Sequence, residues 1–132
     1  MVPTSTGAAK AVGLVLPELS GKLNGMAIRV PTANVSLVDL VVNTRDAVSV
    51  DAINDALTRA AAGPLSGILC ASSAPIVSSD LVGNAYSSIV DLPLTQTMDG
   101  HTAKLLSWYD NEWGFSSRMI DLVKHLAGLE GR

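Results

Sequence analysis

Cysteine, aromatic residues and excess charge of either sign are all scarce in this 132-residue chain. One cysteine cannot form a disulfide within the chain, which excludes a disulfide-stapled secreted scaffold and indicates a reducing compartment. Nine Lys and Arg stand against twelve Asp and Glu, so we expect no nucleic-acid partner. No apolar run reaches the ~18 residues of a membrane span, and the first residues lack the features of a signal peptide. We therefore expect a cytoplasmic protein with no membrane partner.

Hydrophobic residues make up 48% of the chain and aromatic residues only 4%, so the core must be built from Val, Leu, Ile and Ala. This composition is too apolar for a disordered chain. The length suits one domain, which would bury about two-thirds of the surface of its unfolded chain.

Apolar residues at helical spacing predict three helices, over residues 8–19, 50–62 and 116–127. Pro17 is expected to end or kink the first helix, because proline cannot donate the next helical hydrogen bond. Ser49 is the predicted N-cap of the second helix, and Gly63 is expected to end it in a left-handed conformation. Gly128 is the predicted stop of the third helix.

Short apolar runs bounded by turn residues predict strands over residues 26–30, 35–42, 67–71, 75–79, 86–91 and 102–109. The run 35–42 is apolar on both faces, which predicts at least partial cover on both. Asp99 and Gly100 predict a hairpin. The fold class is therefore α+β, a largely antiparallel mixed sheet with helices packed on one face. No Gly-x-Gly-x-x-Gly turn follows a strand, so no dinucleotide-binding half is visible.

Side chains suited to catalysis are few. Cys70 lies in an apolar run and is interpreted as a small core residue, because neither His101 nor His125 is placed in the sequence to activate a thiolate. Two separated histidines and one distant cysteine make no zinc pattern, so we expect no metal site.

Three segments nonetheless have the chemistry of binding sites. Thr6 and Gly7 begin a helix, where free N–H groups and the helix dipole attract anions, although most such pairs are only caps. Arg29 lies in an otherwise apolar strand and needs either a buried carboxylate partner or a phosphate or carboxylate ligand. Residues 107–114 crowd aromatic and polar side chains into a strand-to-helix turn, which is either a packed turn or a loop presenting an amide to a ligand.

In this order, these segments resemble the C-terminal part of phosphorylating glyceraldehyde-3-phosphate dehydrogenase. The resemblance rests on three runs of sequence. They are Pro-Thr-Ser-Thr-Gly-Ala-Ala-Lys-Ala-Val at 3–12, Gly-Met-Ala-Ile-Arg-Val-Pro-Thr-Ala-Asn-Val-Ser at 25–36, and Trp-Tyr-Asp-Asn-Glu-Trp-Gly at 108–114. It covers essentially the whole chain and implies part of a catalytic domain.

The family oxidises glyceraldehyde 3-phosphate to 1,3-bisphosphoglycerate with NAD, in glycolysis and gluconeogenesis, through an acyl-thioester that inorganic phosphate cleaves. The resemblance implies that Thr6 and Gly7 line the site of inorganic phosphate and that Arg29 contacts substrate or inorganic phosphate. Asn111 would hold the nicotinamide carboxamide of NAD. Phe115 would pack near the nicotinamide at a position that is often Tyr, and Tyr109 would lie near the reactive thiol.

The family's nucleophile segment, Ser-Cys-Thr-Thr-Asn-Cys, does not occur in this chain. The resemblance also includes neither the segment with the family's His base nor its NAD-binding domain. We therefore expect no catalytic residue in the 132 residues, no turnover by the chain alone and no NAD binding without the missing domain. The family also implies a homotetramer.

Two alternatives stay open. One is a fragment of erythrose-4-phosphate dehydrogenase, whose C-terminal region also carries Asn-Glu-Trp-Gly-Phe, as at residues 111–115 here. The other is a non-catalytic oligomerisation or interaction module, because a partial domain exposes apolar sheet surface and an unpaired edge.

Overall fold

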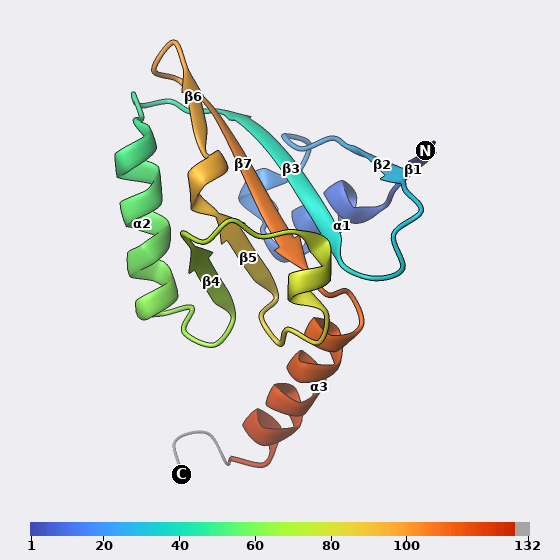
Figure 1. Cartoon of the computed structure of the whole chain (residues 1–132). Helices are drawn as coiled ribbons and strands as arrows, with labels where there is room; N and C mark the ends of the chain where they lie inside the picture. Colours follow the sequence, from blue (N-terminus) through green and yellow to red (C-terminus); the bar gives the residue numbers. More distant parts are fainter. Residues whose placement is uncertain (129–132) are drawn as a thin grey trace. The chain divides into compact units, whose positions relative to one another are not determined.

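The computed structural model of the chain describes residues 1–128, which divide into two compact units, 1–33 and 34–128. Each unit is described here by itself. The described elements include three α-helices and two sheets, as the α+β prediction requires (Figure 1). Within residues 1–128, no helix combines the length and apolar character needed to cross a membrane.

The first unit is built on a two-stranded antiparallel ribbon. Strands β1 (Val2–Ser5) and β2 (Met26–Arg29) pair from Val2 opposite Arg29 to Ser5 opposite Met26. Helix α1 (Ala8–Val15) and the 3-10 turn Pro17–Leu19 lie between the two strands in sequence. The helix ends before Pro17, as predicted, whereas β1 was not predicted because its four residues show no apolar alternation.

The second unit is built on a five-stranded mixed sheet. Its strands are β3 (Ser36–Asn43), β4 (Leu69–Ser72), β5 (Ser88–Asp91), β6 (Gln96–Met98) and β7 (Thr102–Tyr109). Their order is β3-β7-β5-β4, with β6 also pairing with β7. Only the β4–β5 pair is parallel, so the sheet is largely antiparallel.

Helix α2 (Val50–Ala62) begins and ends at the predicted residues. The Ser49 hydroxyl accepts a hydrogen bond from the Ala52 N–H at 3.2 Å, which confirms it as the N-cap. The left-handed conformation predicted for Gly63 is wrong, since its φ is −122°. The chain instead leaves the helix through a turn in which the Leu65 N–H donates to the Ala60 carbonyl.

The hairpin between β6 and β7 forms at the predicted pair, with φ of 51° at Asp99 and 74° at Gly100. These left-handed angles are the reason that an Asp-Gly pair is favoured at this turn. Strand β6 itself was not predicted, because it is only three residues long.

The strand predicted over residues 75–79 is wrong. That segment is irregular and leads into the 3-10 turn Ser78–Leu81. Pro75 has no N–H for a sheet ladder, and the Asp80 carboxylate takes the Val77 N–H at 2.8 Å, which bends the chain away from a strand.

A small core lies beside the sheet of the second unit. Val35, Leu81 and Ile89 are buried, and Cys70, Ile76, Tyr86 and Trp108 pack against them. The interpretation of Cys70 as a small hydrophobic residue therefore agrees with its surroundings. By contrast, the cover predicted on both faces of residues 35–42 is incomplete among the described residues, because four apolar side chains of β3 are 39–60% exposed.

Candidate functional site

The end of β7, the following loop and the start of helix α3 (Trp113–Leu126) form one wall of a cavity of about 320 Å³. The cavity is lined by Ser87, Tyr109, Asp110, Asn111, Gly114, Phe115 and Arg118. The three residues predicted to face the cofactor and the reactive thiol, Tyr109, Asn111 and Phe115, thus share one cavity. The strand-loop-helix connection accounts for this, because it spaces them at the last strand residue, the loop and the first helical turn.

Asn111 presents a free amide at this cavity. Its side chain is exposed, and within residues 1–128 no hydrogen bond uses it. The ring of Phe115 is 64% exposed next to it in the cavity wall. An amide with an unused donor and an unused acceptor can pair with another carboxamide, and an exposed ring offers a flat apolar surface.

Asp110 organises the loop that carries Asn111. It is 1% exposed, and its two carboxylate oxygens accept four hydrogen bonds. Oδ1 takes the N–H groups of Glu112 at 3.0 Å and Trp113 at 2.9 Å, while Oδ2 takes the Gly83 N–H at 2.8 Å and Asn34 Nδ2 at 2.9 Å.

The hydrogen bonds from Trp113 and Gly83 are the main reason that the pKa of Asp110 lies below its ordinary value, against the opposing effect of burial. The bonds from Glu112 and Asn34 act in the same direction. The predicted packed turn, with an Asp bonded to the local backbone, is thereby confirmed.

The same cap explains why α3 begins at Trp113, three residues earlier than predicted. Oδ1 of Asp110 satisfies two N–H groups that a helix start leaves without a partner. Gly114 allows the first turn to approach the backbone of Tyr86, since a Cβ at this position would lie 3.1 Å from the Tyr86 carbonyl oxygen. The predicted end at Gly128 is consistent with its φ of 65°.

In the first unit, Thr6 and Gly7 lie between β1 and α1. The Thr6 hydroxyl accepts the Ala8 N–H at 3.2 Å, so its own hydrogen stays available for a ligand. The first turn of α1 has no acidic residue to compete for the remaining N–H groups. Among the described residues, a Cβ on Gly7 would meet no atom within 4 Å, so packing in this part of the chain gives no reason for glycine here. Close approach of an anion would supply one.

Arg29 lies at the other end of the same ribbon. It pairs opposite Val2, whereas Thr6 follows the Ser5–Met26 pair, so the two sites are about four residue rises, ~13 Å, apart along the strands. Of the two alternatives left open for Arg29, the buried ion pair does not form, because the side chain is exposed and no ion pair involves it in the described part of the chain. The two-stranded ribbon leaves it uncovered.

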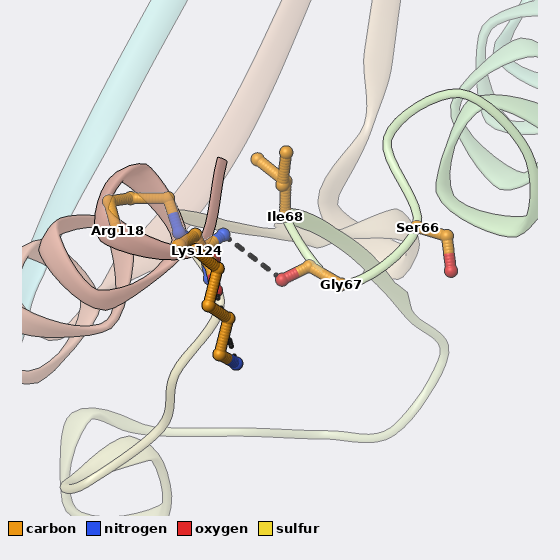
Figure 2. A pocket seen from close by; sticks show the side chains of 6 residues that line it. Ser66, Gly67, Ile68, Arg118 and Lys124 are labelled. Atoms are coloured by element: carbon orange, nitrogen blue, oxygen red, sulfur yellow. Dashed lines mark hydrogen bonds and ion pairs between the residues drawn. The ribbon is translucent and has the colours of Figure 1, made fainter. Parts of the chain in front are cut away.

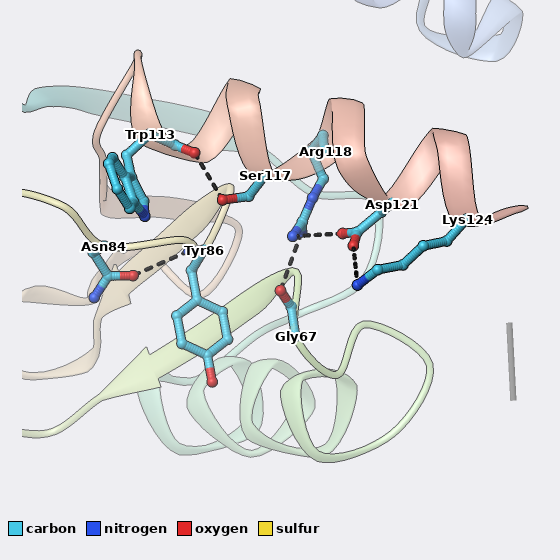
Figure 3. Close-up of polar contacts among 8 residues, drawn as sticks. All are labelled: Gly67, Asn84, Tyr86, Trp113, Ser117, Arg118, Asp121 and Lys124. Atoms are coloured by element: carbon cyan, nitrogen blue, oxygen red, sulfur yellow. Dashed lines mark hydrogen bonds and ion pairs between the residues drawn. The ribbon is translucent and has the colours of Figure 1, made fainter. Parts of the chain in front are cut away.

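Sequence reasoning missed Arg118, which lines the first cavity and also a second one of about 400 Å³ (Figure 2). Its guanidinium donates to the Gly67 carbonyl at 3.1 Å and pairs with Asp121 at 2.7 Å, with Lys124 4.0 Å from the same carboxylate (Figure 3). The hydrogen bond to Gly67 ties α3 to the loop before β4, whereas the two ion pairs lie within α3. The spacing of Arg118, Asp121 and Lys124 at every third residue was the available signal.

The remaining candidates for catalysis do not converge. His101 is exposed at the β6–β7 hairpin, and His125 lies on α3. Among residues 1–128, no group of three or more His, Cys, Asp or Glu side chains could hold a metal ion.

Comparison with known proteins identifies the family that this chain resembles. The model of the glyceraldehyde 3-phosphate dehydrogenase C-terminal domain matches residues 1–111. The chain is 57% identical over 127 residues to glyceraldehyde-3-phosphate dehydrogenase of Priestia megaterium, covering 96% of this chain and 38% of that protein. It is 50% identical over 131 residues to the protein of the same name from Cryphonectria parasitica, covering 99% of this chain and 39% of that protein.

The fold and these matches define an α+β domain of an oxidoreductase family. The chain belongs to the glyceraldehyde 3-phosphate dehydrogenase family and corresponds to its C-terminal domain. It spans about two-fifths of the length of these relatives.

Proposed function

We propose that this chain supplies the phosphate-facing and nicotinamide-facing residues of an NAD-dependent phosphorylating glyceraldehyde-3-phosphate dehydrogenase. The enzyme would convert glyceraldehyde 3-phosphate and inorganic phosphate to 1,3-bisphosphoglycerate. The observation that carries this proposal is the cavity shared by Tyr109, Asn111 and Phe115.

These residues fit the nicotinamide end of NAD. The free Asn111 amide can donate to the carboxamide oxygen and accept from its NH₂ group, which would fix the rotation of the ring. Phe115 would pack against the nicotinamide without the hydrogen bond that a Tyr could add. NAD, when bound, accepts the hydride that leaves the substrate carbon. Asp110 supports this arrangement because its four hydrogen bonds hold the loop on which Asn111 lies.

Thr6 and Arg29 would bind different anionic groups, given their separation along the ribbon. Thr6, Gly7 and the start of α1 suit inorganic phosphate, because the hydroxyl and the backbone N–H groups donate to its oxygens. The exposed Arg29 guanidinium suits a second phosphate, including that of the triose phosphate substrate.

The chemical step needs a thiolate that these 132 residues do not supply. Cys70, the one cysteine, packs against the core rather than in the Asn111 cavity. We therefore propose that the chain alone is inactive and that the nucleophile, its base and the nucleotide-binding domain come from further polypeptide.

In the working enzyme we propose a cytoplasmic homotetramer. Erythrose 4-phosphate remains the alternative substrate, since it offers the same aldehyde and phosphate groups.

Phosphate binding is tested by thermal unfolding of the chain with and without inorganic phosphate at constant ionic strength. We expect phosphate to raise Tm, because a ligand that binds only the folded state stabilises it. Arg29→Ala and Thr6→Val should each weaken this rise, while Arg45→Ala, an exposed arginine outside the site, should not. An equal rise in all four proteins would contradict the assignment.

Nicotinamide recognition is tested by NMR titration with nicotinamide mononucleotide. Because the nucleotide-binding domain is absent, we expect no tight binding, only small shift changes at Asn111 and Phe115 at high nucleotide concentration. These changes should be weakened in Asn111→Asp, because a carboxylate cannot donate to the carboxamide oxygen. Asn24→Asp, in an exposed loop of the other unit, is the matched control. Shift changes that are the same in both variants would remove Asn111 from the site.

A further inference from the structure

The loop before β2 contains an asparagine followed by glycine. Six asparagines occur in the chain, and Asn24 is the one with glycine after it. Asn24 and Gly25 lie between the 3-10 turn Pro17–Leu19 and β2, in a stretch without regular secondary structure, and both are exposed. Neither residue belongs to the sites proposed above.

The loop holds the backbone nitrogen of Gly25 against the side chain of Asn24. The Gly25 N–H donates to Asn24 Oδ1 at 2.8 Å. Because a C=O bond is about 1.2 Å long, Cγ of Asn24 lies within about 4 Å of the same nitrogen. The β1–β2 ladder begins at Met26, so it does not engage the Gly25 N–H. Gly25 also has no Cβ to shield its own nitrogen from Cγ.

Asn34 shows the same local hydrogen bond in different surroundings. The Val35 N–H donates to Asn34 Oδ1 at 2.7 Å. Val35, however, is buried and β-branched, so its side chain crowds its nitrogen. The Asn34 amide is also held, because its Nδ2 donates to Asp110 Oδ2 at 2.9 Å. Asn34 is therefore an internal control for Asn24.

We propose that Asn24 is a site of spontaneous deamidation. The Gly25 nitrogen forms a bond to Cγ of Asn24, the bond from Cγ to Nδ2 breaks, and Nδ2 leaves as ammonia with the proton of the Gly25 amide. Water then opens the five-membered succinimide ring at one of its two carbonyl carbons. The product is aspartate, or isoaspartate where the main chain continues through Cγ.

The product places a negative charge at the end of the ribbon where the proposed phosphate site begins. Ser5 pairs with Met26, so Thr6 and Gly7 leave the ribbon at the same end at which Asn24 and Gly25 enter it. A carboxylate there repels an anion, and isoaspartate also lengthens the main chain just before β2. Deamidation thus weakens phosphate binding at Thr6 and Gly7, a consequence that rests on the proposed function.

Deamidation is measured by incubating the 132-residue chain at neutral pH and mapping its tryptic peptides by mass. Trypsin releases residues 23–29, in which Asn24 is the one asparagine. We expect this peptide to gain about 1 Da with time, since OH replaces NH₂, while Asn34 stays unchanged. Fragmentation of the peptide separates aspartate from isoaspartate.

Gly25→Ala is the matched variant, because it keeps Asn24 and adds only a Cβ. Among the described residues this Cβ would meet no atom within 4 Å, and the φ of Gly25 lies outside the left-handed region. The variant should therefore fold like the unaltered chain. We expect it to deamidate at least about tenfold more slowly, because the Cβ crowds the attacking nitrogen.

The effect on phosphate is measured by the rise in Tm that phosphate causes at constant ionic strength, in fresh and in incubated protein. The unaltered chain should lose this rise in step with the converted fraction, whereas incubated Gly25→Ala should keep it. Fresh Asn24→Asp should show at most about half the rise. Asn43→Asp makes the same charge change in the second unit, can still accept the Thr102 hydroxyl, and should show the full rise.

A peptide 23–29 that gains no mass overturns the deamidation, and so does equal conversion in Gly25→Ala. If Asn24 converts but fresh Asn24→Asp keeps the full rise, or if Asn43→Asp loses as much, the effect on phosphate is overturned. If fresh unaltered chain shows no rise at all, the proposed phosphate site fails together with that effect, and the mass map still decides the deamidation. Circular dichroism of each variant verifies that it is folded.

Discussion

Asp110 is a buried carboxylate whose four hydrogen-bond partners are all N–H donors. Replacing Asp110 by Asn keeps the shape of the side chain but turns one carboxylate oxygen into an NH₂ group. That NH₂ group would then face N–H donors instead of accepting from them. We expect Asp110→Asn to lower the free energy of unfolding by about 2–3 kcal/mol, since buried donors lose their acceptor. Denaturant unfolding followed by Trp fluorescence measures this.

Asp99→Asn is the control for that loss. Asp99 also accepts two backbone N–H groups, from His101 and Thr102, but in an exposed turn, and Asn tolerates its left-handed φ. We expect a change within about 0.5 kcal/mol for this surface substitution. Equal losses in the two variants would mean that the Asp110 hydrogen bonds are no more important than those of an exposed turn.

The lowered pKa of Asp110 also predicts a pH dependence. Because the folded-state pKa lies below the unfolded value of about 4, this carboxylate contributes its full stability above pH ~4 and loses it as pH falls through the folded value. Below about pH 4, the stability of the unaltered chain should therefore fall more steeply than that of Asp110→Asn. Parallel stability curves through this acid range would refute the assignment.

Helix α2 depends on local signals that can be altered singly. Ser49→Ala removes the hydroxyl that accepts the Ala52 N–H and should lower stability by about 1 kcal/mol. Thr58→Ala in the same helix is the control: its hydroxyl bonds only to the Asn54 carbonyl, and Ala has the higher helix propensity. Thermal unfolding measures both variants, and a Thr58 variant less stable than the Ser49 variant would contradict the capping argument.

The success of prediction varied among the elements for a physical reason. α2 and the Asp99–Gly100 hairpin were predicted correctly because their signals lie within a few residues of the turns they make. The segment 75–79 failed because one apolar run suits a strand or an irregular stretch equally well. Which of the two formed depended on the hydrogen bond from the Val77 N–H to the Asp80 carboxylate.

Taken as a whole, the chain contains the segments that we propose bind phosphate and nicotinamide, but not the nucleophile segment that the family resemblance implies. We expect no measurable NAD reduction by the 132-residue chain with glyceraldehyde 3-phosphate and phosphate, because no acyl-enzyme can form without the thiolate. The Bacillus subtilis protein named glyceraldehyde-3-phosphate dehydrogenase 1, 56% identical over 127 residues, is a suitable positive control. Turnover that survives removal of any contaminating longer enzyme would disprove the expectation.

The candidate site was predictable in part. The segments containing Thr6, Arg29 and Asn111 were found because each breaks a local rule: a small polar pair at a helix start, a charge in an apolar strand, a polar cluster in a turn. The choice between the two alternatives for Arg29 could not be made from the sequence, since the exposure of its side chain depends on what else covers the ribbon. Arg118 was missed because its spacing with Asp121 and Lys124 indicates only pairs within the helix, and not its contact with Gly67, 51 residues away in the sequence.

The sequence by itself determined the α+β class, the position of α2, the hairpin at Asp99 and the family, because these follow from short-range propensities and from long ordered motifs. Only the tertiary structure decided that Asp110 accepts hydrogen bonds from Asn34 and Gly83, 76 and 27 residues away. It also decided the strand order β3-β7-β5-β4 of the larger sheet. Such contacts depend on which distant segments meet when the chain folds, and no local pattern records that pairing.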